Sequence, residues 1–81
     1  MAARETENFR RNVLSLCTEH GAIQRIADDA KITRPYLSKM LHGRATPSMD
    51  VAAAIAKALA IPLSELLQSP EKFMRNLARA S

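Results

Sequence analysis

The sequence has few of the residues that mark disulfide-linked, secreted or membrane-spanning proteins. It contains one cysteine, two glycines, no tryptophan and only 4% aromatic residues among its 81 amino acids. The single cysteine, Cys17, cannot form an internal disulfide, and we interpret it as a small buried thiol. No apolar run approaches the roughly 20 residues that a membrane-spanning helix needs. Because residues 1–12 are also polar, without the apolar segment of a secretory signal, we expect a cytoplasmic chain with no membrane partner.

Groups that could perform catalysis or hold a metal are also scarce. The two histidines, His20 and His42, lie in different predicted segments, and neither has the cysteine or carboxylate neighbours of a catalytic triad or a metal site. The chain has no glycine-rich loop of the kind that cradles nucleotide phosphates. We therefore predict no catalytic residue, no bound metal and no cofactor, and we expect the protein not to be an enzyme.

The apolar residues that are present recur with a helical period. They make up 47% of the chain, and no long stretch alternates with period two, so the predicted fold class is all-α. Two short apolar series with i, i+3, i+4 spacing follow each other: Ile23, Ile26, Ala27 and Ala30, then Leu37, Met40 and Leu41. Residues 31–33 between them are enough only for a tight turn. Two short helices joined by such a turn predict a helix-turn-helix over approximately residues 22–43.

The second of these helices has typical capping residues at both ends. Thr33 is a good N-cap, because its hydroxyl can accept a hydrogen bond from an N–H of the first turn. Pro35 is tolerated in that turn, where its missing N–H is no loss. Gly43 can adopt the left-handed conformation that ends many helices. We therefore place this helix at residues 33–42; Tyr36 either faces outward or packs half-buried.

The other segments predict a compact five-helix domain over residues 6–68, followed by a short sixth helix. Residues 1–5 are interpreted as a flexible arm, and the first helix is expected from residue 6 or 7 to His20, ended by Gly21. Ser48 is a good N-cap for the fourth helix, and the fifth is expected over residues 63–68. Residues 69–81 form the predicted C-terminal helical tail, opened by Ser69 and Pro70.

Positive charge is concentrated on the second helix of the motif and on the loop after it. Residues 31–49 include four basic residues, Lys31, Arg34, Lys39 and Arg44, and no acidic residue. The other residues carry eight basic and eight acidic groups, so the net charge of +4 lies in this stretch. A solvated basic face is the ordinary explanation of a charge run. A patch of one sign on the outward helix of a helix-turn-helix instead favours a polyanionic partner.

These features together resemble the helix-turn-helix of the lambda-repressor-like family, which comprises phage Cro and repressor proteins and bacterial XRE-type regulators. The resemblance covers approximately residues 9–67. It departs from the family pattern at Lys31, where glycine is usual, at Ile23, where glutamine is usual, and at Leu41, where an acid is common. The matching residues are Ile26-Ala27, Ala30, Ile32-Thr33, Leu37-Ser38, Gly43-Arg44, Thr46-Pro47-Ser48 and the segment from Leu59 to Leu67.

The resemblance implies a sequence-specific regulator of transcription, a repressor, that acts at the nucleoid and binds double-stranded DNA with helix 33–42 in the major groove. Base contacts would set sequence preference, and phosphate contacts would set register and salt-dependent affinity. The expected base-contacting residues are Arg34, Pro35, Tyr36, Ser38 and Lys39. The expected phosphate-contacting residues are Gln24, Thr33, His42, Arg44, Thr46 and Ser48.

Members of this family usually bind palindromic operators as dimers, so a homodimer is expected. The candidate dimer contacts are Leu63, Leu66, Phe73, Met74 and Leu77. Equally, the last three could pack within the chain against the first or the fifth helix. The alternative function is an antitoxin-type or adaptor module whose main partner is another protein, such as a toxin. That function requires a large apolar patch, for which Phe73, Met74 and Leu77 are the only candidates.

Overall fold

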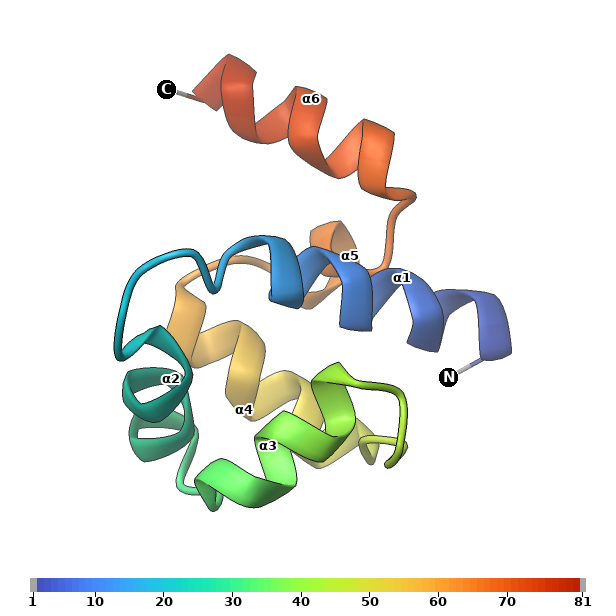
Figure 1. Ribbon diagram of the computed structural model, residues 1–81. Helices are drawn as coiled ribbons and strands as arrows, with labels where there is room; N and C mark the ends of the chain where they lie inside the picture. Colours follow the sequence, from blue (N-terminus) through green and yellow to red (C-terminus); the bar gives the residue numbers. More distant parts are fainter. Residues whose placement is uncertain (1, 81) are drawn as a thin grey trace.

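The described part of the chain is built from helices alone. The computed structural model describes residues 2–80, which contain no strand (Figure 1). The predicted all-α class is therefore confirmed, and the C-terminal tail does form a sixth helix. None of the helices among these residues has the length and hydrophobicity required to cross a bilayer. The helices are α1 (Ala3–Ser15), α2 (Ala22–Ala30), α3 (Arg34–Leu41), α4 (Met49–Leu59), α5 (Leu63–Leu66) and α6 (Pro70–Ala80).

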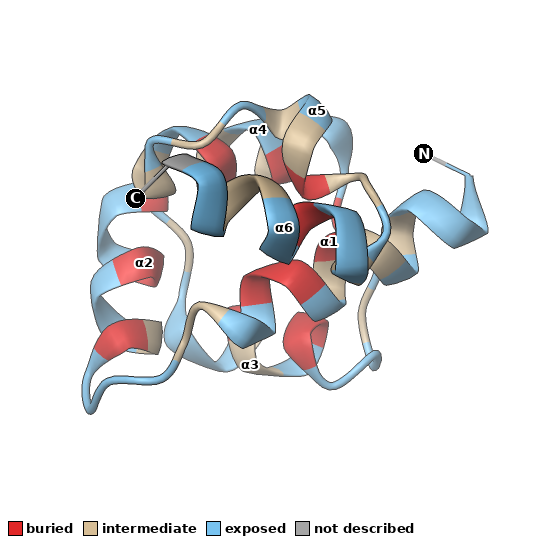
Figure 2. Ribbon diagram, turned by 90° about the horizontal axis from the view of Figure 1, so that it is seen from above, coloured by how far each residue is buried: buried red, intermediate tan, exposed pale blue. Residues whose placement is uncertain are grey.

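The helices pack around one hydrophobic core. α2 contacts α3 and α4, while α1 contacts α3, α5 and α6 (Figure 2). Small buried residues, Ala27 of α2 and Ala52 and Ala56 of α4, suit the close approach of those two helices. The burial of the apolar stripe on each helix stabilises the fold and leaves the opposite face of α3 in solvent. The largest fully buried side chains are Phe9, Asn12, Val13, Leu37, Met40, Leu41, Ile55, Leu66 and Phe73.

The helix-turn-helix forms where the sequence predicts it. Lys31 ends α2 with a φ of 60°, and the next amide, that of Ile32, donates to the Ala27 carbonyl at 3.0 Å. Lys31 thus adopts the left-handed backbone conformation, which reverses the chain direction. Glycine normally occupies such a position. Thr33 then caps α3, and its hydroxyl accepts a hydrogen bond from the Tyr36 amide at 3.3 Å. Gly43, with a φ of 75°, follows the helix as predicted.

The first helix begins and ends earlier than the sequence indicates. The predicted arm of residues 1–5 is wrong for residues 3–5, which form the first turn of α1; Met1 lies outside the described residues. The Ala2 amide donates to the Glu5 carboxylate at 3.2 Å, which satisfies a donor at the helix start. The helix stops at Ser15 because the next amides turn back to carbonyls three residues earlier. Gly21, with a φ of 84°, instead opens α2.

Polar side chains of α1 hold the junction between α5 and α6. The amide of Asn12, only 1% exposed, donates to the carbonyls of Leu66 at 2.9 Å and of Gln68 at 2.8 Å. Asn8 donates to the Leu67 carbonyl at 3.0 Å. Helix α5 ends at Leu66 and not at the predicted Gln68, and these bonds satisfy backbone carbonyls that its end leaves without intrahelical partners. The Ser69 hydroxyl then accepts from an amide of α6, as expected of an N-cap.

The packing of α5 and α6 changes the set of candidate dimer contacts. Leu66 and Phe73 are 0% and 2% exposed, so each has almost no surface with which to contact a second chain. Phe73 takes the alternative role, packing within the chain. Leu63 and Leu77 are half-buried against the same core. Met74 is 48% exposed and is the large apolar residue that α6 leaves on the surface.

Candidate nucleic-acid interface

The outward face of α3 carries a line of exposed side chains that includes a proline, a lysine and a histidine. Pro35, Lys39 and His42 are spaced by four and three residues, so they follow one another along the helix surface. All three are exposed, as is Arg34 at the start of the helix. These residues therefore lie where the sequence predicts them, on the side of α3 that faces away from the core.

Two of the predicted base-contacting residues lie at the edges of that face. Tyr36 is half-buried and packs partly against the hydrophobic core. Ser38 is half-buried as well, and its backbone carbonyl accepts a hydrogen bond from Nδ1 of His42 at 2.7 Å. Because a carbonyl can only accept, this Nδ1 carries a proton. The packing of Tyr36 against the core confirms the half-buried interpretation of that residue.

The four basic residues of the 31–49 stretch all reach solvent. Lys31, Arg34, Lys39 and Arg44 are exposed. The ion pairs found among residues 2–80 join other residues of α1, α2 and the segment between them, and none involves these four cations. A cation that is not neutralised by a protein carboxylate attracts a phosphate more strongly. These exposed cations are therefore suited to a polyanionic partner.

The starts of α2 and α3 border one hollow of about 440 Å³. It is lined by His20, Glu19, Gln24 and Arg34, among others. Gly21 gives α2 no side-chain cap, and the Ala22 amide donates to the Glu19 carbonyl at 3.1 Å. The other first-turn amides and the positive dipole end of this nine-residue helix are suited to an external anion. Gln24, a predicted phosphate contact, lies at this end, but Nε2 of its side chain already donates to Asp28 Oδ1 at 2.8 Å.

The remaining predicted phosphate contacts flank α3 at both ends. Thr33 and Ser48 are exposed N-caps, and the Ser48 hydroxyl accepts from the Val51 amide at 3.2 Å. Since each hydroxyl accepts in the cap, its own proton can still be donated to a phosphate oxygen. Arg44 and Thr46 are exposed on the loop between α3 and α4. The fold therefore gathers these residues around the outward helix.

Comparisons with known proteins agree with this geometry. Residues 22–66, more than half of the chain, match the helix-turn-helix family. The chain belongs to the lambda-repressor-like, XRE-type helix-turn-helix family. Membership of this family of DNA-binding regulators confirms the prediction that the chain is not an enzyme.

Individual relatives of this helix-turn-helix chain include the transcriptional regulator ClgR of Mycobacterium tuberculosis, from strains CDC 1551 and H37Rv. Each is 37% identical to the chain over 62 residues, which is 73% of this chain and 55% of the relative. The chain thus spans about half the length of these curated relatives. No solved structure matches the chain significantly.

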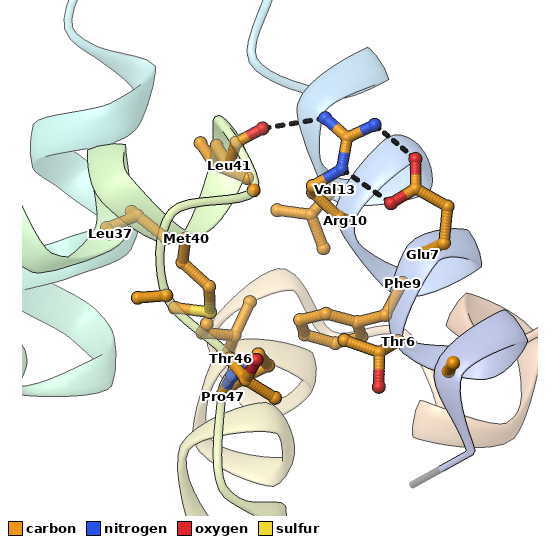
Figure 3. Close-up of a pocket in the computed structure, with 14 residues that line it drawn as sticks. Thr6, Glu7, Phe9, Arg10, Val13, Leu37, Met40, Leu41, Thr46 and Pro47 are labelled. Atoms are coloured by element: carbon orange, nitrogen blue, oxygen red, sulfur yellow. Dashed lines mark hydrogen bonds and ion pairs between the residues drawn. The ribbon is translucent and has the colours of Figure 1, made fainter.

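The helix-turn-helix is tied to α1 by a residue whose role the sequence does not reveal. Arg10 donates from Nη1 to the carbonyl of Leu41, the last residue of α3, at 2.9 Å. The same guanidinium binds both carboxylate oxygens of Glu7, with the Nε to Oε2 distance at 3.0 Å (Figure 3). The hydrogen bond from Arg10 lowers the pKa of Glu7 and raises the pKa of Arg10 itself. The i, i+3 spacing of the two residues could have indicated the pair, but no local pattern indicates the carbonyl contact.

A pocket of about 420 Å³ lies beside this pair, between α1 and the loop after α3 (Figure 3). Its walls include Phe9, Met40 and Pro47, and its rim includes Arg10 and Thr46. Phe9 and Met40 are at most 2% exposed, so the apolar floor offers almost no surface to a ligand. We interpret the pocket as part of the packing interface between α1 and the helix-turn-helix, and not as a ligand site.

Proposed function

We propose that this domain binds double-stranded DNA sequence-specifically and regulates transcription as a repressor. The observation that carries the proposal is the set of exposed cations on α3 and its flanking loops, none of which is paired with a carboxylate within residues 2–80. An α-helix fits the major groove, where each base pair presents a distinct pattern of donors and acceptors. The printed description of the relatives, transcriptional regulator, supports the regulatory role.

We assign base reading to the outward face of α3. The planar fork of Arg34 can donate two hydrogen bonds to O6 and N7 of guanine, and Lys39 can donate to the same atoms from the middle of the helix. Pro35 and the edge of Tyr36 offer apolar contact to a thymine methyl group, with Ser38 beside them. All of these are carried by one helix of eight residues, which fixes their relative positions.

Phosphate binding is assigned to the residues around α3. Arg44 supplies the charge, and the hydroxyls of Thr33, Thr46 and Ser48 supply neutral donors. Gln24 and the N-terminal end of α2 would hold a phosphate near the start of α3. His42 would hold another phosphate near the end of α3. Contacts of this kind are independent of sequence and account for most of the salt dependence of binding.

We further propose that the protein binds a palindromic operator as a homodimer, with half-sites about one helical turn apart. Phosphate contacts by themselves give dissociation constants of only about 10⁻⁴ to 10⁻⁶ M at physiological salt. A second copy of α3 would double the base contacts. The remaining candidate dimer contacts are Met74 with the half-buried Leu63 and Leu77. With Phe73 buried, Met74 is the large apolar side chain that α6 exposes among the described residues, which gives little support to a protein partner such as a toxin.

The test is a comparison of alanine variants on a site selected from a random duplex library and on random duplex. Arg34→Ala and Lys39→Ala should each cost about 1–3 kcal/mol on the selected site and relax its sequence preference. Arg44→Ala should weaken both DNAs alike and reduce the slope of log affinity against log salt by about one. Arg79→Ala removes the same charge from α6, on the far side of α1 (Figure 1), and is the control. Equal losses on both DNAs for Arg34→Ala would refute base reading.

A further inference from the structure

We infer that Glu7 and Arg10 form a clamp that positions α3 and the following loop for DNA binding. In this clamp Arg10 is a positioning residue and does not itself contact phosphate. The inference rests on the proposed function, because it concerns how the DNA-binding face is held.

The first support is the contact of Arg10 with the end of α3. Its Nη1 donates to the Leu41 carbonyl, one of the last carbonyls of the helix, which lack an intrahelical partner. A cation at the C-terminal end of a helix also interacts favourably with the helix dipole. α1 and α3 are thus joined by a charge-assisted hydrogen bond at the point where α3 ends.

The second support is the contact of Arg10 with the loop. A Cβ atom placed on Gly43 would lie 3.8 Å from Cδ of Arg10, so the aliphatic stem of Arg10 lies against the first residue of the loop. Arg44, the predicted phosphate contact, is the next residue. Displacement of Arg10 would therefore affect both the end of α3 and the beginning of the loop.

The third support is the way Glu7 orients the guanidinium. Two oxygens of one carboxylate bind Nε and Nη2, which fixes the plane of the group and aims Nη1 at the Leu41 carbonyl. Three of the five guanidinium N–H donors are used in this way. The Glu7 charge would also repel a phosphate that approached Arg10. The arrangement suits a positioning residue better than a phosphate contact.

The two roles predict opposite changes in the affinity of Glu7→Gln for DNA. If Arg10 contacted phosphate, the loss of the carboxylate charge would strengthen binding to all DNA. If the pair is a clamp, binding to the selected site should weaken about 1.5- to 5-fold, the range of an exposed ion pair, although an acidic charge is removed. Affinity for random duplex should stay the same or rise. Glu71→Gln makes the same charge change on α6 and should leave the ratio of selected to random affinity unchanged.

A second measurement tests the clamp without DNA. The amides of Gly43 and Arg44 donate to the carbonyls of Met40 at 3.1 Å and Lys39 at 2.8 Å. In Glu7→Gln and in Arg10→Met, which keeps most of the aliphatic stem, hydrogen exchange at these two amides should be faster than in the wild type. Exchange within α4 should not change.

The outcomes separate the two proposals. Tighter binding of Glu7→Gln to the selected site, or unchanged exchange at Gly43 and Arg44, would overturn the clamp alone. Absence of DNA binding by the wild-type protein would overturn the proposed function, and the role of the clamp in DNA binding with it.

Discussion

Backbone strain is stored at two equivalent helix ends, and its relief can be measured. Lys31 has φ 60° and ψ 41° after α2, and Ala60 has φ 57° and ψ 36° after α4. In both cases the next amide, of Ile32 or Ile61, donates to a carbonyl five residues earlier, at 3.0 and 3.1 Å. Both residues are exposed. Lys31→Gly and Ala60→Gly should therefore raise the free energy of unfolding.

The size of the gain follows from two opposing terms. A left-handed conformation costs an L-residue about 1–2 kcal/mol. Glycine removes this cost, but it also stabilises the unfolded chain by about 0.4–1 kcal/mol through greater conformational entropy. The net gain for Ala60→Gly is about 0.5–1 kcal/mol, which raises Tm by about 2–8 °C in a domain of this size. Lys31→Gly should gain less, because it also removes a cation near the C-terminal end of α2.

Thermal and urea unfolding, followed by circular dichroism, check these values. Gly43→Ala is the reverse control, because Gly43 has a φ of 75° and a methyl group there would meet only Arg10 Cδ at 3.8 Å, an ordinary contact. It should destabilise the protein by about 1 kcal/mol. The reasoning is refuted if Ala60→Gly loses stability while Gly43→Ala has no effect.

The other predictions concern contacts of α1 and α3. Asn12→Ala leaves two carbonyls of the α5–α6 junction without their donor and should lower the free energy of unfolding by about 2–3 kcal/mol; a urea midpoint within error of the wild type would contradict this. Thr33→Val removes the α3 cap and should cost about 1 kcal/mol in the same assay, whereas Thr33→Ser should be nearly neutral. The pKa of Glu7 is lowered by its bond from Arg10. Its stabilising contribution is thus present above the ordinary pKa of the carboxyl group and lost as the pH falls through the lower, folded value. Lowering the pH should therefore reduce the free energy of unfolding more in the wild type than in Glu7→Gln. Parallel curves of this free energy against pH would exclude a contribution from the Glu7 carboxylate.

The helix-turn-helix could be predicted from the sequence because its signals are local. The hydroxyl of Thr33 and the glycine at position 43 act within one turn of the helix that they delimit, and the spacing of Leu37, Met40 and Leu41 fixes its inner face. Once the inner face is known, exposure of Arg34, Lys39 and the loop cations follows.

The parts that could not be predicted depend on contacts between distant segments. The Asn12 amide bonds carbonyls more than 50 residues away, and Arg10 bonds a carbonyl 31 residues away. A backbone carbonyl has no residue identity, so the sequence contains no pattern for such partners. The same holds for Phe73, whose burial depends on where α6 packs, while its helical spacing suits either packing or self-association.

Binding of the purified protein to random duplex DNA across a salt series, with its mass in solution recorded, tests the proposed function most directly. We predict binding whose affinity falls steeply as salt increases, together with the mass of a dimer. Absence of binding even at low salt would contradict DNA recognition by α3.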